Sequence, residues 1–168
     1  MAEWQRDDYA KALGRLIANF HFLEFALRAS LYLADTPPAE RMPKSVRLAA
    51  LRPGDSLPLS HLSSYDSLRE LIRKYNAHQT ARGGTPEVDE GFADLRDTIA
   101  HGRVLSDQLD GAPVAVKFER PAKGRDAVHV EFAVELTIER LREKSGAVAE
   151  AATSVFSRVQ LLGVGTPE

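Results

Sequence analysis

The chain has 168 residues, of which 43% are hydrophobic and 27% are charged, a balance typical of globular domains. This length is enough for one well-buried domain and short for two, so we expect a single domain over residues 1–168. Cysteine is absent, which excludes disulfides and thiolate metal sites and fits a reducing compartment. The formal net charge of −2 argues against non-specific duplex binding but permits a small site for one or two phosphates.

The N-terminal sequence predicts neither a signal peptide nor a membrane anchor. "MAEWQRDDYAK" lacks the basic start and the apolar run of a signal peptide. No stretch of the chain reaches the roughly 18 apolar residues that a membrane span needs. We therefore expect a cytoplasmic protein without a membrane partner.

The first predicted helix covers residues 7–34 and is apolar on more than one face. Its main stripe has helical three- and four-residue spacing: Leu13, Leu16, Ile17, Phe20, Leu23, Leu27 and Leu31. A second apolar band lies beside it: Phe22, Phe25, Ala26, Ala29, Tyr32 and Leu33. Such a helix is either central in a bundle or shared with a partner chain.

A long proline-rich connection follows, over residues 36–62, with a short helix expected at 44–51. The second main helix is predicted over residues 64–78, with a buried stripe of Leu68, Leu71, Ile72 and Tyr75. In the third predicted helix, Thr85 is the expected N-cap and Pro86 is the first helical residue. Its expected core face consists of Val88, Phe92, Leu95 and Ile99, and Gly102 is the expected C′ residue.

Two alternating segments, "APVAVKFERP" and "AVHVEFAVEL", predict a β-hairpin within about 103–136, with "AKGRD" as its turn and a short strand at 103–106 beside it. The last helix is expected to start near Thr137, with Leu141, Val148, Ala152, Val155, Val159 and Leu162 as its core stripe. The predicted fold is therefore mainly α: a four-helix up-and-down bundle with a β-hairpin inserted before the last helix.

The segment "LRDTIAHGRV" brings together Arg96, Asp97 and His101. An arginine followed five residues later by a histidine occurs a second time, as "RKYNAH" from Arg73 to His78, so the spacing alone is weak evidence. Helix geometry separates Arg96 from the core stripe by roughly 70° and places Asp97 and His101 roughly opposite the core. His101 is therefore expected to face solvent, a partner chain or a ligand.

"LRDTIAHG" resembles the R-x4-H motif of HEPN domains, helical domains found in many prokaryotic toxin, CRISPR-associated and abortive-infection ribonucleases. That family prefers Asn, Asp or His after the arginine, which Asp97 satisfies and Lys74 in the second match does not. "IANFHFLEFALRASL" is similar to the F-x2-LE-x2-LR pattern of the family's opening helix, here including Glu24 and Arg28. The resemblance covers about a third of the chain and does not include the hairpin or the proline-rich loop.

The resemblance implies a homodimer in which both protomers contribute to one cleft that cleaves RNA without a metal. His101 would act on a ribose 2′-hydroxyl as base or positioning group, Arg96 would stabilise the phosphate, and Asp97 would orient one of them. Candidate substrate-binding residues are Asn19, Glu24, Arg28 and Arg103. A toxin–antitoxin or phage-defence role, with an antitoxin-type protein partner, follows from the resemblance alone.

Other interpretations of the same residues stay open. His101 next to Gly102 is also what a helix end favours, and Glu24 with Arg28 is also an ordinary intrahelical ion pair. The alternative function is a non-catalytic module of the same fold that binds nucleotide, RNA or a protein partner, and a third is a structural dimer. The remaining histidines, His21, His61 and His129, are scattered without metal-ligand spacing, and no glycine-rich phosphate loop is present, so we expect no metal and no cofactor.

In one regular helix, Arg96 and His101 diverge by about 140°. They converge on one phosphate only if the helix unwinds near Gly102 or a second chain supplies the other half.

Overall fold

The computed structural model describes residues 3–42, 50–85, 87–105, 112–119 and 127–163, with the side chains of 3–5 and 160–163 excepted. The main helices are α1 (Glu3–Asp35), α2 (Leu68–Ala81), α3 (Gly91–His101) and α4 (Ile138–Gly163). A short 3-10 helix, η1, covers Pro38–Glu40, and three strands, β1 (Arg103–Leu105), β2 (Val114–Phe118) and β3 (Val130–Glu135), lie between α3 and α4. The fold is mainly helical, as predicted, with a small sheet.

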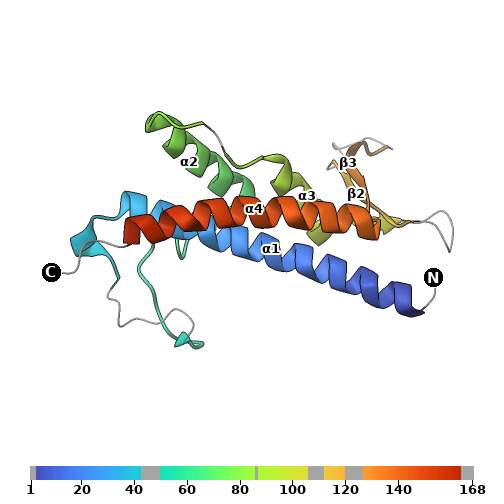
Figure 1. Ribbon diagram of the computed structural model, residues 1–168, viewed down its shortest axis with the longest axis horizontal. Helices are drawn as coiled ribbons and strands as arrows, with labels where there is room; N and C mark the ends of the chain where they lie inside the picture. Colours follow the sequence, from blue (N-terminus) through green and yellow to red (C-terminus); the bar gives the residue numbers. More distant parts are fainter. Residues whose placement is uncertain (1–2, 43–49, 86, 106–111, 120–126, 164–168) are drawn as a thin grey trace.

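The two long helices α1 and α4 lie side by side and run in the same direction (Figure 1). In the first half of α4, Ser145 accepts two hydrogen bonds from the Asn19 amide, one at its carbonyl and one at its hydroxyl, both at 2.9 Å. Further along both helices, the ring of Phe156 lies 5.4 Å from that of Phe22 and 6.2 Å from that of Phe25, centroid to centroid. Later residues of α1 thus meet later residues of α4.

This parallel pair differs from the predicted up-and-down order, in which the first and fourth helices are antiparallel. The hydrophobic period of a helix shows which face is buried and is the same for both directions of the chain. Direction is decided by the connections, and the end of the long segment between α1 and α2 lies against the second half of α1. There Arg28 donates to the carbonyls of His61, Ser64 and Asp66, just before α2 begins.

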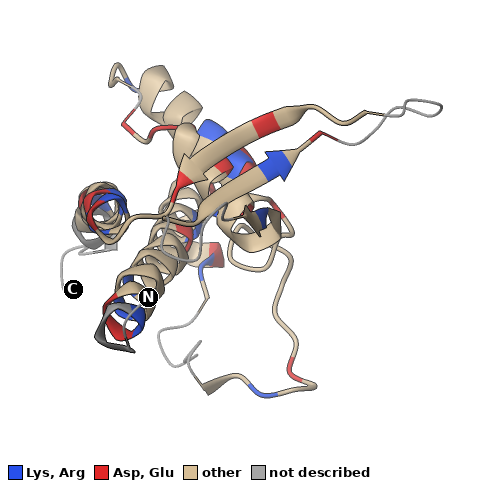
Figure 2. Cartoon of the chain, turned by 90° about the vertical axis from the view of Figure 1, so that its right-hand side faces the viewer, with Lys and Arg blue, Asp and Glu red and all other residues tan. Residues whose placement is uncertain are grey.

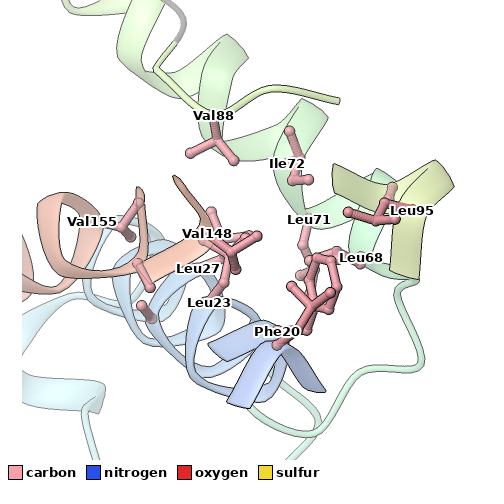
Figure 3. Close-up of a cluster of buried hydrophobic side chains, with 14 of the residues drawn as sticks. Phe20, Leu23, Leu27, Leu68, Leu71, Ile72, Val88, Leu95, Val148 and Val155 are labelled. Atoms are coloured by element: carbon pink, nitrogen blue, oxygen red, sulfur yellow. The ribbon is translucent and has the colours of Figure 1, made fainter. Parts of the chain in front are cut away.

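The core lies where α2, α3 and the sheet cover one side of the α1–α4 pair. Figure 3 shows Phe20, Leu23 and Leu27 of α1 facing side chains of α2 and α4. The buried cluster also includes Leu16, Leu31, Leu68, Leu71, Ile72, Tyr75, Val88, Leu95, Leu141, Val148, Ala152 and Val155. The predicted stripes of α1, α2 and α4 are therefore confirmed at these positions, whereas Ile17 remains 39% exposed.

Helix α2 begins with a capping box, later than the predicted start at residue 64. The Ser67 hydroxyl accepts from the Glu70 backbone N–H at 3.3 Å, and the Glu70 carboxylate accepts from the Ser67 N–H at 2.7 Å. The predicted start of α3 is wrong, because the helix begins at Gly91 with Glu90 as its N-cap residue. Pro86 and most of the predicted short helix at 44–51 lie outside the described residues.

A side chain of α2 explains the late start of α3. The Oδ1 atom of Asn76 accepts from the backbone N–H groups of Glu87 and Val88, and its amide donates to the Val88 carbonyl at 2.8 Å. These backbone groups are thus held against α2 and are not used in a first helical turn. Val88 and Leu95 are buried as predicted, while Phe92 and Ile99 are half-buried and Ala93 and Thr98 are buried in their place.

The predicted hairpin and its neighbouring strand form a three-stranded antiparallel sheet in the order β1-β2-β3. Arg103 pairs with Val116, and Ala115 pairs with Val134; an irregularity falls between Lys117 and Phe118. The "AKGRD" turn lies outside the described residues. Helix α4 begins just after Thr137, as predicted, and the Thr137 hydroxyl accepts from the Arg140 N–H at 3.1 Å. None of the described helices has both the length and the apolar character that a membrane span requires.

Candidate functional site

Arg96 lines a cleft between α1 and α3. The cleft has a volume of about 170 Å³ and is lined by Ile17, Phe20, His21 and Glu24 from α1 and by Arg96, Ile99 and Ala100 from α3. Arg96 and Ala100 are four residues apart and therefore share one side of α3. The guanidinium of Arg96 on α3 thus lies across the cleft from His21 and Glu24 on α1, and the other lining residues are apolar.

Asp97 holds the arginine from the next position in the helix. The Arg96 Nη1 atom lies 3.2 Å from Asp97 Oδ1, and the two side chains are 39% and 35% exposed. This single contact leaves other guanidinium N–H groups of Arg96 for a further acceptor, since arginine has five donors. Asp97 thus occupies the position expected of a residue that orients the arginine.

His101 lies on another side of α3. It is the last residue of the helix, it is exposed, and it does not line the cleft. Because α3 is helical from Gly91 through His101, the helix does not unwind before Gly102, and the divergence of about 140° between Arg96 and His101 stands. One chain therefore does not bring these two residues together at this cleft.

Gly102 ends α3, but not in the left-handed conformation typical of a C′ glycine. Its φ of −72° and ψ of 171° are open to any residue, and its N–H donates to the Thr98 carbonyl at 2.8 Å. A Cβ atom at this position would lie 2.3 Å from the Thr98 carbonyl oxygen and 2.9 Å from that of Val116. Glycine is needed here because the chain passes close to both α3 and β2.

His21 is the cleft residue that the sequence analysis missed. It is an exposed residue of α1, four residues after Ile17 and three before Glu24, both of which line the same cleft. That helical spacing is a signal present in the sequence. It acquires meaning only once α3 is known to pack beside this face of α1, which periodicity does not reveal.

Two of the predicted substrate-binding residues have structural partners away from the cleft. Asn19 joins α1 to α4 through Ser145. The guanidinium of Arg103, on β1, lies over the Phe118 ring, 5.6 Å from its centroid. Neither residue lines the cleft that holds Arg96.

The other two, Glu24 and Arg28, form the expected ion pair, with 2.9 Å between Arg28 Nη2 and Glu24 Oε1. Glu24 lines the cleft, whereas Arg28 reaches away from it to the segment before α2. In that segment, hydrogen bonds from Lys74 and from Ser64 hold the pKa of Asp66 below its usual range. Arg28 therefore anchors the end of the proline-rich connection.

The second Arg–His match has other partners. Arg73 Nε donates to Glu90 at 2.8 Å, and His78 Nε2 lies 3.8 Å from Asp35 Oδ1, where His61 Nε2 also approaches Oδ2 at 2.8 Å. Among the described residues, no group of three or more histidine, aspartate and glutamate side chains is arranged to hold a metal ion. Comparisons of the chain with protein-family models, with curated proteins and with solved structures find no match.

Proposed function

We propose that the protein is a HEPN-like, metal-independent endoribonuclease whose site forms between two copies of the chain. The observation that carries this proposal is the position of Arg96 at a cleft with an exposed His101 on another side of the same short helix. A second copy that packs around α3 would place the His101 of one chain opposite the Arg96 of the other. The R-x4-H motif supports this proposal, which includes a HEPN-like four-helix fold.

The proposed chemistry uses the two residues in complementary roles. His101 accepts the proton of a ribose 2′-hydroxyl, and the 2′-oxygen then bonds to the adjacent phosphorus. Arg96 binds the phosphate oxygens as negative charge builds on them, while Asp97 keeps the guanidinium in position. The bond to the 5′-oxygen breaks, and the leaving oxygen takes a proton from water.

Ile17 supports a partner at this place. It lies on the rim of the cleft and is 39% exposed, although it belongs to the main apolar stripe of α1. A second chain that packs at this cleft would cover the exposed part of this apolar side chain. In a two-fold dimer the same contact occurs twice, so two equivalent sites form.

Cleavage of RNA in the presence of EDTA tests the proposal. Arg96→Ala and His101→Ala are expected to lower the cleavage rate at least about 100-fold, as loss of acid–base or phosphate-stabilising groups does. Arg73→Ala and His78→Ala, which have the same spacing but other partners, are the matched controls and are expected to keep full activity. Equal trace activity in the wild type and in all four variants would contradict the proposed endoribonuclease activity.

Mixing the two inactive variants tests whether the site is shared. A heterodimer of Arg96→Ala with His101→Ala contains one composite site with both residues intact. After subunit exchange, half of the dimers are mixed, so about a quarter of wild-type activity is expected to return. If activity does not return while sedimentation shows mixed dimers, the composite site is wrong.

The second candidate function is a non-catalytic module of the same fold that binds nucleotide, RNA or a protein partner. The ion pair between Arg96 and Asp97 favours it, because an arginine that is already paired is also suited to a structural role. This candidate predicts RNA binding without cleavage, and equal binding by the wild type and His101→Ala.

A further inference from the structure

We propose that the open face of the α1–α4 pair binds a single strand of nucleic acid. This face is away from α2, α3 and the cleft at Arg96, and the proposal holds whether or not the protein cleaves RNA. It rests on two neighbouring features of the face: a basic groove at its N-terminal end and exposed aromatic rings further along.

The basic groove is formed because α1 and α4 are parallel. A cavity of about 450 Å³ is lined by Ala12, Arg15, Asn19, Arg142, Ser145, Gly146 and Ala149, and a smaller one of about 180 Å³ next to it adds Asp8 and Lys11. The small side chains of the alanines, and the glycine, leave this space between the two helices unfilled. Figure 2 views the molecule from the end at which both helices begin, where charged residues of both signs lie on α1 and α4.

Three cations, Lys11, Arg15 and Arg142, line this groove against a single carboxylate, that of Asp8. All three cationic residues are exposed, and none of them takes part in an ion pair between described residues. The polar side chains at the bottom of the groove bind each other, since the Asn19 amide donates to the carbonyl and the hydroxyl of Ser145. The groove therefore presents three exposed cations, in a protein with a net charge of −2, to a phosphate-bearing ligand.

The exposed aromatic rings favour a strand of nucleic acid over a small phosphate compound as the ligand. Phe22 and Phe25 are 37% and 45% exposed and lie next to the Phe156 ring. From Lys11 to Phe25 the helix rises by about 21 Å. Cations followed by exposed rings along one track are what sequence-tolerant single-strand binding uses, with phosphates on the cations and bases stacked on the rings.

Fluorescence anisotropy with labelled RNA and DNA strands of about 10 nucleotides tests the proposal, since this length lies within known single-strand site sizes. Arg142→Glu is expected to weaken binding at least about tenfold. Arg140→Glu is the matched control: it changes the same charge two residues earlier, on another side of α4, and is expected to bind like the wild type. The two strand types distinguish RNA from DNA as the ligand.

Salt dependence and the aromatic variant give independent measurements. Replacing Lys11, Arg15 and Arg142 together by glutamine is expected to reduce the slope of log Kd against log salt by about 2. Phe25→Ala is expected to weaken binding about tenfold without changing that slope. Equal affinity of Arg142→Glu and Arg140→Glu would overturn the proposal. So would competition by inorganic triphosphate as strong as by the strand, or a Phe25→Ala variant that changes only the oligomeric state.

Discussion

Arg28 shows how a residue singled out by a family-like pattern is used in this chain. Its side chain is 14% exposed, and it donates to Glu24, to the Ser64 hydroxyl and to three backbone carbonyls between residues 61 and 66. A guanidinium supplies this many donors in a fixed plane, which an ammonium does not. The arginine thus fixes the return of the chain from the proline-rich connection to α2.

We therefore expect Arg28→Lys to destabilise the fold although it keeps the charge. The loss should be about 2 kcal/mol in the free energy of unfolding, since several charge-assisted hydrogen bonds are lost from a largely buried place. Urea unfolding followed by circular dichroism measures it. Arg140→Lys, at an exposed position of α4, is expected to change the value by less than about 0.5 kcal/mol. Equal values for the two variants would contradict the anchoring role.

At the candidate site, the sequence predicts on which side of its helix a residue lies. It does not predict which residues of different helices come together. Helix geometry places Arg96 beside the core stripe and His101 away from it, and both agree with the structure. That His21 shares the cleft with Arg96 depends on how α1 and α3 pack, and no spacing within either helix contains this information. Whether Arg96 and His101 form one site stays a prediction.

Among the elements, α3 has a sterically constrained end. Gly102 leaves the helix between the Thr98 carbonyl and the Val116 carbonyl of β2, with no room for a Cβ atom. Both contacts are with backbone atoms, which cannot move aside as a flexible side chain can. The position of the sheet relative to α3 is therefore tied to the absence of a side chain at residue 102.

Gly102→Ala is accordingly expected to lower the free energy of unfolding by about 1–3 kcal/mol through overpacking. Gly14→Ala, in the middle of α1 with open space around it, is the control with the opposite sign. It should stabilise the protein by about 0.5–1 kcal/mol, because alanine favours a helix interior over glycine. Thermal unfolding of both variants gives the comparison, and a neutral Gly102→Ala would show that α3 and β2 can separate at little cost.

Element boundaries were predictable where a local signal sets them. Thr137 caps α4 through its own hydroxyl, and the alternating segments become β2 and β3. The start of α3 was not predictable from Thr85, because Asn76 of α2 accepts from the Glu87 and Val88 N–H groups that a Thr85 cap would bind. Its amide also donates to the Val88 carbonyl, which an earlier first turn would use. A tertiary hydrogen bond thus overrides a local capping preference.

At the scale of the whole molecule, a polar cluster joins the far ends of α2 and α4. Arg158 of α4 donates to Gln79 and contacts Glu87, and the hydroxyl of Tyr75 donates to Glu87 at 3.3 Å. Burial, and secondly the carboxylate of Glu87, raise the pKa of Tyr75 to about 12. The folded protein therefore favours the neutral phenol.

This raised pKa predicts a loss of stability at alkaline pH. In the unfolded chain a tyrosine ionises with a pKa near 10. The contribution of Tyr75 to the free energy of unfolding is therefore fully present below about pH 10. Between about pH 10 and 12 the unfolded chain has fewer bound protons than the folded one, and stability falls. The free energy of unfolding should thus decrease more steeply in this range for the wild type than for Tyr75→Phe. Parallel curves for the two proteins would contradict the assignment.

The parallel pairing of α1 with α4 has a consequence for how the protein is made. Roughly 100 residues separate the end of α1 from the start of α4, so a ribosome needs about 5 to 20 s to supply the partner helix. During this time Leu16, Leu23 and Leu27 lack the helix that covers one side of them in the finished fold. A chaperone, or the α1 of a neighbouring nascent chain, therefore competes with the protein's own last helix for the same apolar surface.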